Sequence, residues 1–236
     1  MSEDFVPTPV GKARVTWYPA RGRARAVALL GHGSATGIES ADLQALAGAL
    51  PPRDVTVALV TQPYRVAANP RAADEASLDL AWTAVWPAAA DLGVPVIAGG
   101  RSAGAQVACR TAAGLGALAV LALAYPLLGP GSPAELLATG RPTLVVQGGS
   151  DPFGRPGQFP PLPPEIDLVE IPSANHTFGT PTGIPRAASM TRITTAVTEW
   201  IDRQLAAAPT RGWPCPGTPR RRRLRPSWRS WPGAGR

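Results

Sequence analysis

The sequence has little of several features that mark particular classes of protein. Its two cysteines, Cys109 and Cys215, show neither metal-ligand nor disulfide spacing, which argues against a disulfide-rich or zinc-ribbon protein. The longest apolar run, residues 117–128, falls well short of the ~20 residues that cross a bilayer. Residues 1–9 are acidic and lack the positive and apolar segments of a signal peptide. We therefore expect a cytoplasmic protein that does not enter a membrane.

Acidic residues are absent from the C-terminal end of the chain. The net charge is +7, but residues 208–236 contain eight arginines and no Asp or Glu. Residues 1–207 hold 15 basic and 16 acidic residues and are nearly neutral. The overall charge therefore does not predict a nucleic-acid-binding domain. Nucleic acid is expected as a partner only through the Arg- and Trp-containing tail, which is also typical of unselected extensions.

Short aliphatic runs alternate with helical patterns from residue 13 to residue 207. Unbroken runs of this kind are typical of strands buried on both faces of a parallel sheet. We predict an α/β fold with a mostly parallel central sheet flanked by helices. We expect no cap domain, because only ~17 residues separate the run at 118–124 from the run at 143–147. The expected parts are an N-terminal extension (1–12), one domain (13–207) and a disordered Pro/Arg/Trp-rich tail (208–236). The expected strands are 13–18 (at an edge), 27–30, 55–60, 94–98, 118–124, 143–147 and 166–171, and the expected helices are 39–50, 72–92, 103–114 and 187–207.

Residues 100–104, Gly-Arg-Ser-Ala-Gly, lie where a strand pattern ends and a helical pattern begins. They fit the G-x-S-x-G nucleophile elbow, in which a sharp turn strains the backbone of the serine. Glycines two positions before and after it remove side chains that would collide with the neighbouring strand and helix. The pattern predicts Ser102 as a nucleophile above the carboxyl edge of the sheet. The alternative is a glycine-rich turn with an incidental serine.

A serine needs a general base to become a nucleophile, and the chain has two histidines. His176 follows the last expected strand and precedes the last helix, so it is the candidate base. An unused histidine in a surface loop is the alternative. His32 follows the strand 27–30, in the loop that supplies an oxyanion donor in this architecture. It fits better as a neighbour of that donor than as the base.

The base needs an acid that orients it and stabilises its charged form. Asp151 stands just past the carboxyl end of an expected strand and is the candidate, with a simple turn-capping role as the alternative. Asp167 and Glu170 are weaker candidates because they lie within a strand. The order Ser102, Asp151, His176 along the chain is the one expected for the α/β-hydrolase fold.

Two backbone N–H groups are expected to bind the oxyanion of the reaction, those of Ala103 and of Ser34 (or Gly33). Nothing in the sequence implies a metal or an organic cofactor. Arg65 and Arg101 could pair with an acidic substrate, although solvated arginines are more common. The expected apolar wall of the substrate pocket, with ordinary loop packing as the alternative, is formed by Tyr64, Leu127, Phe153 and Phe178.

The segments GHGSATG, GGRSAG, AYPL, QGGSDPFG and NHTFG resemble the small α/β-hydrolases of the dienelactone-hydrolase-like group. They are most similar to the family that holds testis-expressed protein 30 and subunit 3 of the nonspecific-lethal complex. The resemblance covers residues 13–207 and implies a cofactor-free serine hydrolase with Ser102, Asp151 and His176 in the roles given above. Two positions depart from it: Ala103 stands where members carry a bulkier residue, and Ala105-Gln106 where they carry Gly-Arg.

These observations together predict a serine hydrolase that cleaves a small ester, lactone or other acyl substrate through a Ser-His-Asp triad and an acyl-enzyme. The only partner they call for is the small-molecule acyl substrate. A non-catalytic scaffold or binding protein that retains the hydrolase fold is the alternative.

Overall fold

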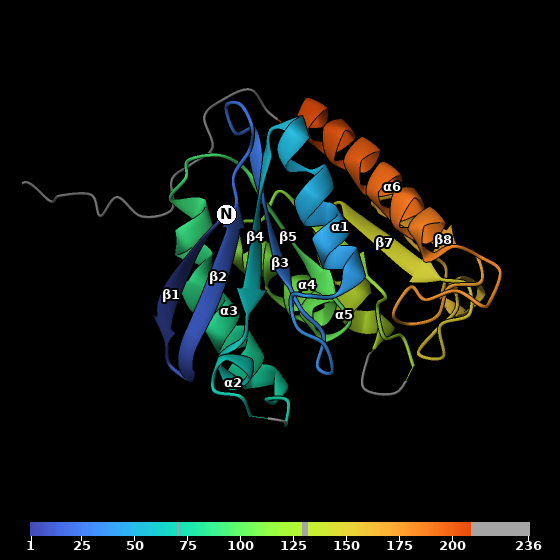
Figure 1. Ribbon diagram of the computed structural model, residues 1–236, viewed down its shortest axis with the longest axis horizontal. Helices are drawn as coiled ribbons and strands as arrows, with labels where there is room; N and C mark the ends of the chain where they lie inside the picture. The colour runs from blue at the N-terminus through green and yellow to red at the C-terminus, as the bar shows by residue number, and fades with distance from the viewer. Residues whose placement is uncertain (70, 129–131, 209–236) are drawn as a thin grey trace, which may run out of the picture.

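Eight strands form one sheet at the centre of the protein (Figure 1). The computed structural model describes residues 1–69, 71–128 and 132–208. The strand order is β1-β2-β4-β3-β5-β6-β7-β8; the β1–β2 and β2–β4 pairs are antiparallel and all others are parallel. The strands are β1 (Ser2–Thr8), β2 (Gly11–Tyr18), β3 (Ala26–Gly31), β4 (Val55–Thr61), β5 (Val96–Arg101), β6 (Ala119–Leu123), β7 (Thr143–Gly148) and β8 (Ile166–Ile171).

Helices cover both faces of this sheet and create a separate apolar layer on each. In β3, Val27 and Leu29 face one layer while Ala28 and Leu30 face the other. Because side chains alternate along a strand, a strand buried on both faces must be apolar throughout, which is the pattern in the sequence. Helices α1 and α6 cover one face, and α3 and α4 the other (Figure 1). The α-helices are α1 (Ala41–Ala49), α2 (Pro63–Val66), α3 (Glu75–Ala90), α4 (Ala103–Leu115), α5 (Pro133–Leu137) and α6 (Arg186–Ala207).

The predicted strand and helix alternation, and the mostly parallel sheet flanked by helices, are confirmed. Between β6 and β7 the described residues contain only the five-residue helix α5, so they form no cap over the sheet edge. The part of the chain that the structure describes contains no helix with the length and apolar character needed to span a bilayer. The expected disorder of the tail concerns residues that, from 209 onward, lie outside the described part of the chain.

The N-terminal edge of the sheet differs from the sequence expectation. Residues 2–8, which we expected to lie in an extension, form β1 and pair along their whole length with β2. The expected edge strand at 13–18 is therefore an inner strand, and β1 is the edge. Side chains along β1 are exposed or half-buried, so the strand has no hydrophobic periodicity to detect. Its position depends on the backbone ladder, on polar contacts such as Trp17 Nε1 to Asp4 Oδ2 at 2.8 Å, and on the half-buried Val6, which packs against one apolar layer.

Candidate active site

The turn between β5 and α4 consists of a single residue, Ser102. Its backbone has φ 52° and ψ −118°, a conformation that costs a non-glycine residue of the order of 1–3 kcal/mol. A Cβ on either Gly100 or Gly104 would lie 2.5 Å from the carbonyl oxygen of Gly31 on the neighbouring strand. The structure therefore bears out the steric reason for both glycines. The Ser102 side chain makes no capping hydrogen bond to α4, which leaves its hydroxyl available to another partner.

That partner is His176, in the loop after β8. The Ser102 Oγ lies 3.0 Å from His176 Nε2, and His176 Nδ1 lies 2.8 Å from Asp151 Oδ2. An imidazole with its proton on Nδ1 donates to the carboxylate and accepts from the serine hydroxyl. Asp151 has no exposed surface, whereas the His176 side chain retains some access to solvent. The structure thus joins three residues distant in the sequence into one hydrogen-bonded chain.

Two further groups hold the Asp151 carboxylate in place. The backbone N–H of Phe153 donates to Oδ1 at 2.8 Å, and the Gln147 side chain donates to Oδ2 at 3.0 Å. The same Gln147 amide lies 2.7 Å from the Gly154 carbonyl and 3.2 Å from the Tyr125 carbonyl, so acceptors on three sides fix its orientation. Sequence reasoning missed Gln147, although it is a buried polar residue in an apolar run.

The weaker candidates for the acid do not contact His176. Asp167 points to the surface, where its carboxylate lies 3.5 Å from Arg203. Glu170 is exposed on the edge strand β8. Both lie within the strand, before its carboxyl end, whereas Asp151 follows the end of β7.

The loop that carries His176 is shaped by Asn175, another residue that the sequence reasoning missed. The Asn175 side-chain oxygen accepts hydrogen bonds from the N–H and hydroxyl of Thr177 and from the N–H of Gly179, each at 2.9 Å. Asparagine side chains commonly stabilise turns in this way. The signal was present in the NHTFG segment, where an asparagine directly precedes the histidine.

His32, the other histidine, is buried and fully used by its own surroundings. Its Nδ1 lies 2.8 Å from the Gly33 carbonyl, and its Nε2 accepts a hydrogen bond from the Gln62 backbone N–H at 3.0 Å. Burial lowers the pKa of His32, which favours the neutral ring. Because its acceptor nitrogen faces a backbone N–H, His32 cannot receive a proton from Ser102 in this arrangement.

The loop after β3 reaches the nucleophile elbow. A Cβ on Gly33 would lie 3.3 Å from the Cβ of Ser102, so this loop packs directly against the serine. Ala103 is the first residue of α4, where the N–H has no acceptor within the helix. Within the described ranges, neither the Ala103 nor the Ser34 backbone N–H donates a hydrogen bond to a backbone carbonyl.

The four residues expected in a pocket wall lie in different surroundings. Phe153 is 41% exposed, and the centre of its ring lies 4.6 Å from that of His176. Leu127 is buried near Gly154, and Phe178 is 0% exposed and packs in the core layer beside α6. Phe178 has a left-handed backbone, with φ 53°, and its complete burial keeps it out of the wall of a surface pocket.

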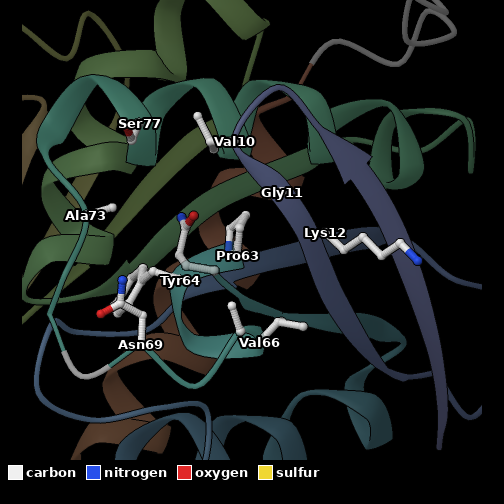
Figure 2. A pocket seen from close by; sticks show the side chains of 11 residues that line it. Val10, Gly11, Lys12, Pro63, Tyr64, Val66, Asn69, Ala73 and Ser77 are labelled. Carbon is white, nitrogen blue, oxygen red and sulfur yellow. The ribbon is translucent and has the colours of Figure 1, made fainter.

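Tyr64 is the fourth of these residues and lines a cavity of about 480 Å³. Figure 2 shows it next to Asn69, with Pro63 nearer to Gly11, the first residue of β2. Its hydroxyl lies 3.4 Å from the Ser34 carbonyl, at the loop that borders Ser102. The lining of this cavity includes no member of the hydrogen-bonded chain.

The two arginines considered for an acidic substrate are both paired within the protein. Arg65 lies 3.5 Å from Glu39 at the surface. Arg101 is buried, and its guanidinium lies 3.2 Å from the Asp42 carboxylate. Arg101 thus faces the interior and not a substrate. For metals, residues 1–69, 71–128 and 132–208 contain no group of three His, Cys, Asp or Glu side chains placed to hold an ion.

A family model for the alpha/beta hydrolase domain matches residues 24–202. The chain belongs to the alpha/beta hydrolase family. The match extends from just before β3 into α6 and includes Ser102, Asp151 and His176. A comparison with curated protein sequences found no match.

Solved structures show the same α/β-hydrolase fold over nearly the whole chain. An alpha-beta serine hydrolase homologue from Coxiella burnetii has 16% identity and a TM-score of 0.69, covering 85% of this chain and 97% of its own. A serine hydrolase without a lid from Xanthomonas campestris has 20% identity and a TM-score of 0.69, covering 88% and 96%. A dienelactone hydrolase from Anabaena variabilis has 21% identity and a TM-score of 0.65, covering 86% and 96%. At these identities the likeness establishes the fold.

Proposed function

We propose that the protein is a serine hydrolase that transfers the acyl group of a small ester, lactone or related substrate to water. The observation that carries this proposal is the continuous hydrogen-bonded chain from Ser102 through His176 to Asp151. A serine within 3.0 Å of an imidazole that is itself oriented by a buried carboxylate is the arrangement that activates a hydroxyl. The strained backbone of Ser102 supports the same role, since strain persists where the surroundings impose it.

The reaction begins when the Ser102 Oγ attacks the substrate carbonyl carbon while His176 Nε2 takes its proton. Asp151 keeps the other ring nitrogen protonated and stabilises the imidazolium. The negative charge that develops on the carbonyl oxygen is bound by the N–H groups of Ala103 and Ser34, each worth ~3 kcal/mol in comparable sites. His176 then protonates the leaving alcohol, which departs and leaves an acyl group on Ser102. A water molecule, deprotonated by His176, releases the acid and restores the serine.

The surroundings of the site favour small substrates with an apolar or aromatic part. The described residues between β6 and β7 form no cap, so the serine is approached directly from the carboxyl edge of the sheet. The exposed ring of Phe153 beside His176 offers an apolar surface to an acyl or aryl group. The dienelactone hydrolase among the similar structures makes lactones and simple esters the first substrates to test.

Two finer assignments accompany this proposal. The quoted motifs support placing the chain with the family of testis-expressed protein 30, within the broader alpha/beta hydrolase family. The two cysteines, which lack disulfide spacing, support a cytoplasmic enzyme, and the near-neutral charge of residues 1–207 supports a small-molecule acyl substrate as its partner over nucleic acid.

The test is labelling of the full chain with a fluorophosphonate probe, together with hydrolysis of p-nitrophenyl acetate. Wild-type protein should label stoichiometrically and hydrolyse the ester, whereas Ser102→Ala and His176→Ala should do neither. Ser150→Ala, which changes another serine outside the hydrogen-bonded chain, is the matched control and should label normally. A folded wild-type protein that neither labels nor hydrolyses esters or lactones would contradict the proposal and favour a non-catalytic binding protein.

A further inference from the structure

Arg101, the residue just before the candidate nucleophile, has a buried side chain with contacts to three other segments. Its side chain is buried, with 2% exposed. Arginine is rarely buried without a partner, and Arg101 has several. Its Nε lies 3.2 Å from the Asp42 carboxylate at the start of α1. Its Nη1 donates to the Thr36 hydroxyl at 2.8 Å, in the loop after β3, and its Nη2 donates to the backbone carbonyl of His176 at 2.5 Å.

Two of these contacts connect the elbow to the oxyanion loop and the base loop, which the proposed reaction requires. Thr36 lies on the loop that offers the Ser34 N–H, and His176 carries the base. A Cβ on Gly33 would lie 3.1 Å from Arg101 Nη1, so the guanidinium packs directly against this loop. Among the described residues, Arg101 is the donor that the structure gives to the His176 carbonyl.

We propose that Arg101 is a positioning residue that fixes the base loop and the oxyanion loop relative to the elbow. A guanidinium suits this task because its planar fork presents donors in several fixed directions. A lysine ammonium, a single flexible point charge, does not reproduce that geometry. Asp42 is also buried and balances the charge, so the pair adds no net charge beside Ser102.

Stability alone does not account for this arrangement. Removing two charges from water carries a desolvation penalty, so a buried ion pair is often no more stabilising than apolar residues of the same size. Two of the three guanidinium nitrogens of Arg101, Nη1 and Nη2, donate to the Thr36 loop and the His176 loop. Both loops also have backbone turns of their own. What Arg101 adds is a defined distance between these loops, and a misplacement of ~1 Å in an active site can cost a factor of ~100 in rate.

The inference rests on the proposed function, and its test uses three variants of the full chain. Arg101→Met combined with Asp42→Asn removes the guanidinium without leaving a buried unpaired carboxylate. Thr36→Val removes one contact at a half-buried position and preserves shape. Arg110→Met is the matched control, because Arg110 is another largely buried arginine that pairs with acidic residues, Asp79 and Glu135, away from the site. For each protein, kcat and KM for p-nitrophenyl acetate are measured well below its unfolding temperature, with fluorophosphonate labelling alongside.

The double variant should lower kcat by ~10- to 100-fold and change KM by less than about 3-fold, because misplaced catalytic groups affect the transition state more than binding. Thr36→Val should lower kcat by ~3- to 10-fold, a smaller effect than that of the double variant, because it removes one contact of Arg101 and leaves its contact to the His176 carbonyl in place. Arg110→Met should reduce the unfolding temperature and leave kcat unchanged.

A folded double variant with wild-type kcat would overturn the role of Arg101. If the double variant does not fold, Thr36→Val decides, and an unchanged kcat there overturns the role equally. Failure of the proposed function has a different signature, since wild-type protein itself would then neither label nor hydrolyse the ester.

Discussion

The packing of the elbow predicts opposite effects for the same substitution at two positions of one helix. Gly104 and Gly114 both lie in α4, which spans Ala103–Leu115. A Cβ on Gly104 would lie 2.5 Å from the oxygen and 2.6 Å from the carbon of the Gly31 carbonyl, and 2.9 Å from the carbonyl oxygen of His32. A Cβ on Gly114 would meet no atom within 4 Å. Gly104→Ala therefore forces backbone apart, whereas Gly114→Ala fills open space.

The expected magnitudes follow from two opposing effects. Alanine is favoured over glycine inside a helix by ~0.8–1.0 kcal/mol, so Gly114→Ala, close to the helix end, should stabilise the protein by ~0.5–1 kcal/mol. At Gly104 the same gain is opposed by an overpacking cost at the upper end of the usual ~1–3 kcal/mol or beyond, because all three nearest atoms are backbone. A net destabilisation of ~2 kcal/mol corresponds to a fall of roughly 4–8 °C in the unfolding temperature of a domain of this size.

Thermal and urea unfolding of both variants measure the stabilities, and the fluorophosphonate labelling rate reports on the site. Gly104→Ala should also slow labelling, since α4 must move away from β3 and carries Ser102 with it. Gly114→Ala should label at the wild-type rate. Equal stability changes for the two variants would refute the steric account of the elbow.

Three further predictions concern single residues of the site. Asp151→Asn should lower kcat for p-nitrophenyl acetate by ~10⁴-fold, because a neutral amide no longer fixes the tautomer of the base; a loss below ~10-fold would contradict the role of the carboxylate. Ser102→Gly should be more stable than Ser102→Ala by about 1 kcal/mol in urea unfolding, since the ~1–3 kcal/mol of relieved strain exceeds the extra chain entropy of glycine. His32 has a lowered pKa in the native protein, so below pH ~6.5 the unfolded chain binds a proton that the native protein does not. The free energy of unfolding therefore decreases as the pH falls, by up to ~1.4 kcal/mol per pH unit. Urea unfolding at pH 7.5 and at pH 5.5 should show a steeper loss for wild type than for His32→Asn, and equal losses would exclude the effect.

Local patterns carried most of the fold prediction because the signals for buried strands are strong. The aliphatic runs at 27–30 and 55–60 are apolar on both faces, and the structure buries β3 and β4 on both faces. Residues 2–8 escaped prediction because most side chains of this edge strand are exposed, so its place depends largely on backbone pairing and leaves no hydrophobic period in the sequence.

The three residues joined by hydrogen bonds could be picked out because each stands at a junction that the sequence marks. Ser102 is flanked by glycines, and Asp151 and His176 each follow the end of a strand. The direction of a side chain is not marked in this way. Phe178 lies in the core layer among residues of α6, and Arg101 turns inward, where Asp42 and two loops converge on it. Such outcomes depend on contacts between distant segments.

The most direct test of the account is to trap the acyl-enzyme and locate it. Full-length protein is mixed with excess p-nitrophenyl acetate, quenched in acid within the first turnover, digested and mapped by mass spectrometry. The account predicts a burst of p-nitrophenol and one acetylated peptide, modified at Ser102, that is absent from the His176→Ala variant. Ester hydrolysis without a burst and with Ser102 unmodified, or acetylation at another residue, would contradict Ser102 as the nucleophile.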